Sequence, residues 1–124
     1  MADKVIDASA LAALAFAEPS ADAVIDQIDG HRLHAPTLLA FELMNVAWKR
    51  SKKQPAASAL FLEALDELEG LELRFRGIDQ REVVKLALST GLTAYDAAYL
   101  WLARGLGMPL VTLDKKLGAH AKNL

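Results

Sequence analysis

The sequence of 124 residues contains no cysteine. Disulfide bonds and thiolate metal sites are therefore excluded, and the absence fits a reducing compartment. No uncharged apolar run approaches the roughly 20 residues of a membrane helix. Asp3 and Asp7 interrupt the N-terminus where a signal peptide would need a cationic and then an apolar segment. Together these absences predict a cytoplasmic protein with no membrane contact.

An excess of positive charge is also missing, because the formal net charge is −2. Proteins that nucleic acid holds by bulk charge are usually basic, so only a local basic patch remains open. Internal repeats, low-complexity tracts and linkers are absent too, and the length predicts a single domain over residues 1–124. The hydrophobic fraction of 53% is high, and the surplus could be buried against a partner or a second copy.

Short apolar runs alternate with helical patterns along the chain. Because strands that alternate with helices pair in parallel, the pattern predicts a layered α/β sheet. Ser20 and Thr37 are expected to cap the second and third helices, and Gly105 lies near the predicted end of the sixth. Strands are expected at 4–6, 32–35, 71–75 and 109–113, and helices at 8–17, 20–28, 36–53, 56–68, 79–89, 93–105 and from 114.

Two acids lie at positions that indicate a functional role: Asp7 follows a strand, and Glu42 lies in an apolar helix. Asp7 directly follows the first strand, and ligands of open α/β sheets bind beyond the carboxyl ends of strands. The alternative is a helix N-cap. Glu42 lies within an apolar helix, where a buried carboxylate without a partner costs several kcal/mol or takes up a proton. Its alternative is a polar stripe shared with Asn45, three residues later.

Two further acids have the same ambiguity. Thr93 and Asp96 form a capping-box pattern, and Asp114 follows the last strand, where it caps a helix or serves as a ligand. In a parallel α/β layer all four acids gather at one edge, where their repulsion raises a pKa or requires a cation. Hard oxygen ligands favour Mg²⁺ or Mn²⁺ over Zn²⁺. Three histidines lack metal-ligand spacing and are expected at the surface or in turns: His31, His34 and His120.

The aromatic pattern Tyr95, Tyr99 and Trp101 is interpreted as core rather than as a base-stacking surface. Six basic residues are candidates for binding phosphate. For the four at the end of the third helix, ordinary favourable charge at a helix C-terminus is an equally good explanation. The apolar side chains of the fourth helix belong to the core, a dimer interface or a partner groove. The basic candidates are Lys49, Arg50, Lys52, Lys53, Lys115 and Lys116.

Four segments, 5–11, 41–46, 92–100 and 110–114, resemble in order the motifs of PIN domains, and in detail those of the VapC toxins of toxin–antitoxin pairs. The resemblance implies a three-layer α/β/α sandwich with a central, mostly parallel sheet of four to five strands. It also implies a metal-dependent endoribonuclease that uses Mg²⁺, with Mn²⁺ possible, forms a homodimer and is inhibited by a small antitoxin. Many relatives continue into a further edge strand, which residues 115–124 leave short or absent.

By this resemblance, four residues are the metal-binding and catalytic acids, and four polar residues lie beside them. The metal would polarise an RNA phosphodiester and activate a water for in-line attack. Two alternatives stay open: a non-catalytic PIN-fold interaction module, and a phosphoryl-transfer or receiver-type α/β domain. The acids are Asp7, Glu42, Asp96 and Asp114, and the neighbours are Ser9, Asn45, Thr93 and Thr112.

Overall fold

The computed structural model describes residues 3–122, which contain a parallel sheet of four strands. The order is β3-β2-β1-β4, so the first strand lies inside the sheet and the last strand pairs with it. The predicted parallel α/β architecture is confirmed. The strands are β1 (Asp3–Ile6), β2 (Arg32–Pro36), β3 (Leu73–Arg76) and β4 (Leu110–Val111).

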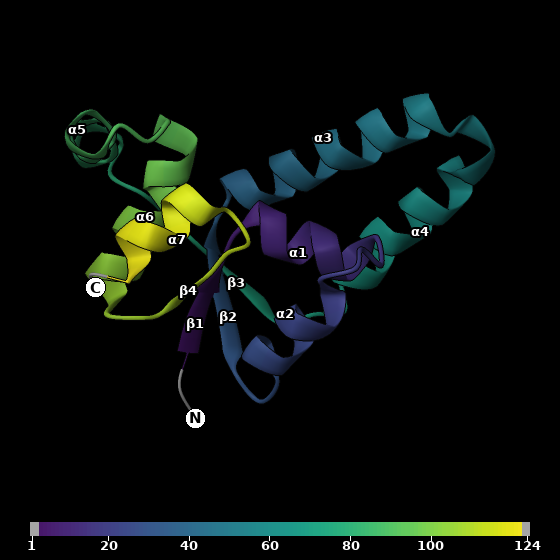
Figure 1. Cartoon of the computed structure of the whole chain (residues 1–124), viewed down its shortest axis with the longest axis horizontal. Helices are drawn as coiled ribbons and strands as arrows, with labels where there is room; N and C mark the ends of the chain where they lie inside the picture. Colours follow the sequence, from purple (N-terminus) through teal and green to yellow (C-terminus); the bar gives the residue numbers. More distant parts are fainter. Residues whose placement is uncertain (1–2, 123–124) are drawn as a thin grey trace.

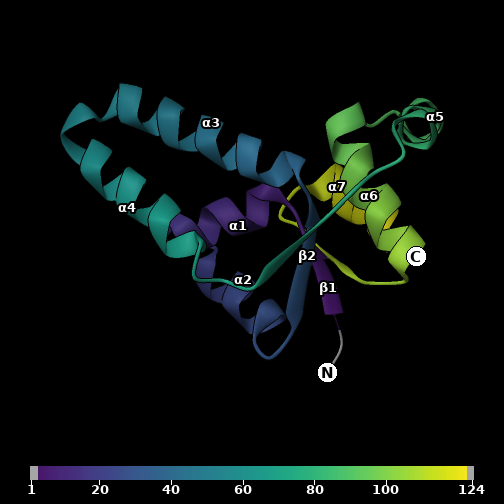
Figure 2. The same cartoon turned by 180° about the vertical axis from the view of Figure 1, so that it is seen from behind.

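Helices cover both faces of this sheet. In Figure 1, α1 to α4 lie on one side and α5 to α7 on the other, which gives the three predicted layers. Figure 2 shows α3 and α4 as a hairpin that extends away from the sheet. The helices are α1 (Ala8–Ala15), α2 (Ala21–Ile28), α3 (Leu38–Lys53), α4 (Ser58–Leu68), α5 (Gln80–Thr90), α6 (Ala94–Leu106) and α7 (Lys115–Ala121), with a 3₁₀ turn, η1 (Pro55–Ala57).

The core lies between the sheet and the helices on its two faces. Val5 and Ile6 are both fully buried, although they point to opposite faces of β1. Strands covered on both faces read as continuous apolar runs rather than as alternating patterns, as β1 does. Across the sheet, Ile6 pairs with Val111, and this register places Asp7 beside Thr112.

Several element ends differ from the sequence prediction. Pro36 ends β2 instead of starting the third helix, and neither Thr37 nor Ser20 makes a side-chain capping bond. The sixth helix passes through Gly105 and ends at Leu106, and its C-cap Gly107 has a left-handed backbone with φ 64°. β4 covers only two residues of the predicted last strand. A composition pattern locates these elements but does not report which groups make the terminal hydrogen bonds.

His34 contradicts the expectation that the histidines lie at the surface or in turns. Its side chain is fully buried in β2. Arg76 Nε donates to His34 Nδ1 at 3.1 Å, so the other ring nitrogen carries the proton and donates to Asp3 Oδ2 at 2.9 Å. This bond lowers the pKa of the Asp3 carboxyl. A histidine with both nitrogens paired can be buried, and its partners come from two other strands.

Residues 3–122 contain no fifth strand, because the chain after Asp114 forms α7. The expectation of a short or absent edge strand is confirmed for that part of the chain. Over the same residues, no helix is long and apolar enough to cross a membrane.

Candidate active site

Asp7 stands at the junction of β1 and α1 and is almost completely buried. Its Oδ1 accepts the backbone N–H of Ala10 at 3.0 Å, which caps α1. Its Oδ2 accepts a hydrogen bond from the Thr112 hydroxyl, at the end of β4. The N-cap interpretation of Asp7 is confirmed. The carboxylate also stands at the sheet edge, where its role as a ligand stays a prediction.

Two hydroxyl groups orient the Asp7 carboxylate. The Ser9 hydroxyl donates to Oδ1 at 2.7 Å and accepts the backbone N–H of Leu113 at 3.0 Å. Thr112 Oγ1 in turn accepts the backbone N–H of Asp114 at 3.0 Å. These bonds tie the start of α1 to the loop after β4 and fix the direction of the Asp7 oxygens.

Glu42 projects from α3 toward α6 and is half-buried. The hydroxyl of Tyr99, a buried residue of α6, donates to Glu42 Oε1 at 2.5 Å. The carboxylate is therefore held by a specific partner rather than lying on a simple wet stripe. Sequence reasoning assigned Tyr99 to the core and missed this contact. Its spacing of three residues from Asp96 places both side chains on one helix face and was the available signal.

The last two acids lie at helix starts beside this pair. Thr93 Oγ1 caps α6 by accepting the N–H of Asp96 at 3.1 Å, which confirms half of the capping box. Asp114 Oδ1 caps α7 by accepting the N–H of Leu117 at 2.9 Å. The Asp96 carboxyl also has a hydrogen bond to the Thr93 side chain, which lowers its pKa against the rise that burial causes.

Repulsion between the carboxylates contributes to the raised pKa values of Asp7, Glu42 and Asp96. Burial raises the pKa of Asp7, and the charge of Asp96 adds to this rise against three hydrogen bonds to the carboxylate. Burial also raises the pKa of Glu42, with contributions from Asp96 and Asp7. The pKa of Asp96 rises through burial and the charge of Asp114. The charge of each predicted acid therefore interacts with that of at least one of the others.

Lys116 supplies positive charge beside Asp96, one of the four acids. Lys116 is the cation that opposes the rise in the pKa of Asp96, and its Nζ also donates to the carbonyl of Gly91 at 2.8 Å. Among residues 3–122, no three acidic or histidine side chains form a complete metal-ligand set. By donor chemistry, however, uncompensated carboxylates fit a hard divalent cation.

Residues 4–123 of the chain match the family model described as PIN domain. The chain belongs to the PIN domain family. It is 34% identical over 120 residues to ribonuclease VapC3 of Pyrobaculum aerophilum, which covers 91% of this chain and 90% of that protein. Exonuclease VapC9 of the same organism is 35% identical over 124 residues, or 95% of this chain and 85% of that protein.

More distant relatives and a solved structure agree with this assignment. Ribonuclease VapC12 of Mycobacterium tuberculosis is 29% identical over 120 residues, covering 96% of this chain and 93% of that protein. The crystal structure of PAE2754 from Pyrobaculum aerophilum superposes with a TM-score of 0.78 at 31% identity, covering 96% of this chain and 84% of that one. The resemblance to PIN domains of the VapC type is confirmed.

A groove of about 690 Å³ opens beside the acids of this PIN domain, between α1 and α3. Glu42 and Ser9 line it, as do Asn45 and Lys49 of α3. Of the predicted basic residues, Arg50 is already paired with Glu18 at 2.6 Å and lies over the ring of Phe16. Lys49 is therefore the basic candidate that the structure places nearest to the groove.

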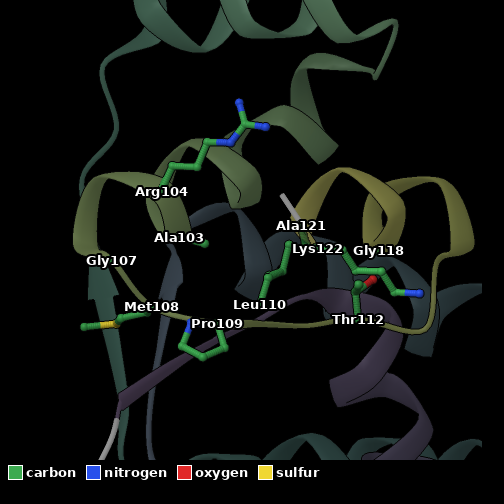
Figure 3. A pocket seen from close by; sticks show the side chains of 10 residues that line it. All are labelled: Ala103, Arg104, Gly107, Met108, Pro109, Leu110, Thr112, Gly118, Ala121 and Lys122. Atoms are coloured by element: carbon green, nitrogen blue, oxygen red, sulfur yellow. The ribbon is translucent and has the colours of Figure 1, made fainter. Parts of the chain in front are cut away.

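Another cavity of the PIN domain, of about 700 Å³, lies along β4 between the end of α6 and α7 (Figure 3). Arg104, Met108 and Leu110 are among its lining residues, and none of the four acids is. Thr112 borders it but donates its hydroxyl hydrogen to Asp7. The groove beside α3, unlike this cavity, is lined by one of the four acids, Glu42, and by Ser9, which donates to Asp7.

Proposed function

We propose that this PIN domain is a metal-dependent endoribonuclease that acts as the toxin of a toxin–antitoxin pair. The single observation that carries the proposal is the Asp7 carboxylate, buried at the carboxyl end of β1 and oriented by Ser9 and Thr112. Its charge interacts with those of Asp96 and Glu42. The names of the relatives, ribonuclease VapC3 and ribonuclease VapC12, support the same reaction class.

The four acids Asp7, Glu42, Asp96 and Asp114 would hold one or two Mg²⁺ or Mn²⁺ ions. A bound divalent ion supplies charge stabilisation at the phosphate and an activated water. Ser9 and Thr112 fix the direction of the Asp7 oxygens, and Tyr99 holds Glu42 in place. Burial and repulsion raise the pKa of Tyr99, so its hydroxyl stays protonated and serves as a donor to Glu42.

Substrate and partners follow from the same family. Phosphate charge near the acids would be offset by lysines at the end of α3 and the start of α7. These are Lys49, Lys52, Lys53 and Lys115. Arg50 is paired with Glu18, and Lys116 donates to the Gly91 carbonyl, so these two are the weaker candidates. We expect a homodimer and a small antitoxin partner, and exposed leucines of α4 leave apolar surface for such contacts. These leucines are Leu60 and Leu62.

The deciding experiment is cleavage of a structured RNA such as tRNA by the wild type, Asp7→Asn and Asp96→Asn. Cleavage that needs Mg²⁺ or Mn²⁺ and is lost in both folded variants is the expected result. A circular RNA substrate separates the endonuclease from an exonuclease, the activity in the name of one relative, because only an endonuclease opens a circle.

An inert wild type would contradict the proposal for the RNAs tested, and a Mn²⁺ titration by calorimetry then separates the remaining readings. Binding that is lost in both variants indicates an intact carboxylate site with another substrate. No binding in any of the three proteins favours the non-catalytic interaction module.

A further inference from the structure

Two aromatic side chains are exposed directly beside the acids. Phe41 precedes Glu42 on α3, and Tyr95 precedes Asp96 on α6. Each side chain is 65% exposed. Tyr95 was expected in the core, and this expectation is wrong: it lies in the first turn of α6 and is exposed, whereas Tyr99, one turn further along the helix, is buried.

Both aromatic rings line one groove, although they come from helices on opposite sides of the sheet. The groove between α1 and α3 is bordered by Phe41, Tyr95 and Leu113, together with Ser9 and Glu42. Within residues 3–122, the hydroxyl of Tyr95 has no hydrogen-bond partner. Neither core packing nor a polar contact therefore explains why these rings stand at the groove.

The groove continues from the acids to positive charge. Val46 and Lys49 line it and also line a neighbouring cavity of about 770 Å³ at the end of α3. That second cavity is bordered by Lys52 and Lys53 and by the exposed ring of Trp48. The outer side of α3 thus leads from Phe41 and Glu42, past the ring of Trp48, to a basic end.

We propose that this groove binds single-stranded RNA, with Tyr95 and Phe41 stacking on unpaired bases next to the scissile phosphate. The inference rests on the proposed function and adds two residues, Phe41 and Tyr95, that would position the bases of the substrate. Aromatic stacking suits splayed, single-stranded bases, whereas bases within a duplex are already stacked on one another. The strand's phosphates would run along α3 toward Lys49 and Lys53, away from the repelling carboxylates.

The charge pattern favours RNA over a protein as the occupant. An apolar protein segment would satisfy the rings alone, but it gives no reason for the basic end that continues the same groove. A nucleic acid strand needs both features, since its bases stack and its phosphates need cations.

The test measures binding of a short single-stranded RNA that carries 2-aminopurine, in EDTA, where metal-dependent cleavage does not occur. Stacking on a ring quenches this base. We expect Tyr95→Ala and Phe41→Ala each to raise Kd by roughly tenfold and to reduce the quenching. Tyr95→Phe keeps the ring and is expected to retain both. Leu88→Ala is the matched control, because Leu88 is 81% exposed on α5 and does not line the groove.

Equal Kd and quenching in the wild type and both alanine variants would overturn the proposal. Unchanged RNA binding with altered self-association or altered binding of the antitoxin would also overturn it, because the groove would then be a protein interface. Quenching that depends on Tyr95 in a wild type that cleaves no RNA would refute the proposed nuclease and leave the stacking site supported.

Discussion

Asp7 divides its hydrogen bonds between the fold and the site. Oδ1 caps α1, and the hydroxyls of Ser9 and Thr112 fix both oxygens in place. An asparagine at this position keeps the cap, because its side-chain oxygen accepts the same backbone N–H. Asp7→Asn therefore removes the charge without removing the helix start.

The charge of Asp7 is predicted to reduce stability when no metal is bound. Its pKa in the folded protein is raised, chiefly by burial, above the value of about 3.9 in an unfolded chain. The folded state thus binds the proton more tightly, and this contribution to stability is full below the unfolded pKa and is lost as pH rises through the folded pKa. In EDTA at about pH 7, we expect Asp7→Asn to unfold at a higher urea concentration than the wild type, and the difference should shrink toward about pH 4.

Urea unfolding of both proteins at several pH values checks this prediction. A variant that is less stable than the wild type by the same amount at every pH would show that hydrogen bonding, not charge, dominates at Asp7.

The hydroxyl of Tyr99 is predicted to stabilise the protein, whereas that of Tyr95 is not. Tyr99 donates to Glu42 Oε1 at 2.5 Å in a buried setting, and hydrogen bonds to charged groups contribute about 1.5–3 kcal/mol. We expect Tyr99→Phe to lower the free energy of unfolding by about 1.5 kcal/mol. Tyr95→Phe is the matched control and is expected to change it by less than about 0.5 kcal/mol. Equal losses in the two variants would contradict the assigned contact.

At the scale of elements, two glycines near the end of α6 differ in backbone conformation. Gly107 has φ 64°, and nothing lies within 4 Å of a Cβ added at Gly105, which is inside the helix. We expect Gly105→Ala to raise the free energy of unfolding by about 0.5–1 kcal/mol, because alanine favours the helix interior. Gly107→Ala is expected to lower it by roughly 1 kcal/mol, since a left-handed alanine is strained. Thermal unfolding of both variants measures the difference, and the reverse order would place the helix end at Gly105.

The basic end of α3 is predicted to contribute phosphate contacts. Each such contact to a single strand adds about 0.7 to the slope of log K against log salt. Replacing Lys49 and Lys53 by glutamine is expected to flatten this slope for single-stranded RNA by roughly 1.4. The control is the α5 pair Arg81→Gln and Lys85→Gln, which removes the same charge at residues that line neither the groove nor the neighbouring cavity. An equal slope in both double variants would show that the α3 lysines do not contact the RNA and only stabilise the helix end.

At the scale of the whole molecule, a divalent ion would join elements that are distant in sequence. Asp7, Glu42, Asp96 and Asp114 come from four separate segments, so an ion bound to them stabilises only the folded chain. At a Mn²⁺ concentration of about 100 times Kd, we expect stabilisation of about 2.7 kcal/mol. Thermal unfolding with and without Mn²⁺ measures it, and Asp96→Asn should lose most of the gain. A gain of the same size in both proteins would place the ion elsewhere.

The candidate site could be predicted from the sequence to a considerable extent. Asp7, Asp96 and Asp114 stand at a strand end or in a first helical turn, and such positions are set by local patterns. Glu42 lies further inside α3, where the apolar surroundings of a carboxylate were the signal. The parallel order then brings the carboxyl ends of β1 and β4 together by a general rule. The order of the acids along the chain was also enough to indicate a PIN domain, as the comparisons confirm.

Burial and partners were outside the reach of the sequence. Local patterns gave no sign that His34 is buried, because its two partners lie 31 and 42 residues away on other strands. The same patterns assigned Tyr95 and Tyr99 alike to the core, although they lie four residues apart on one helix and only Tyr99 is enclosed. The sequence determined which residues meet strand ends and helix caps, since these depend on near neighbours. The tertiary structure alone decided which side chains are enclosed and which line a groove, because exposure depends on what packs against a residue from elsewhere in the chain.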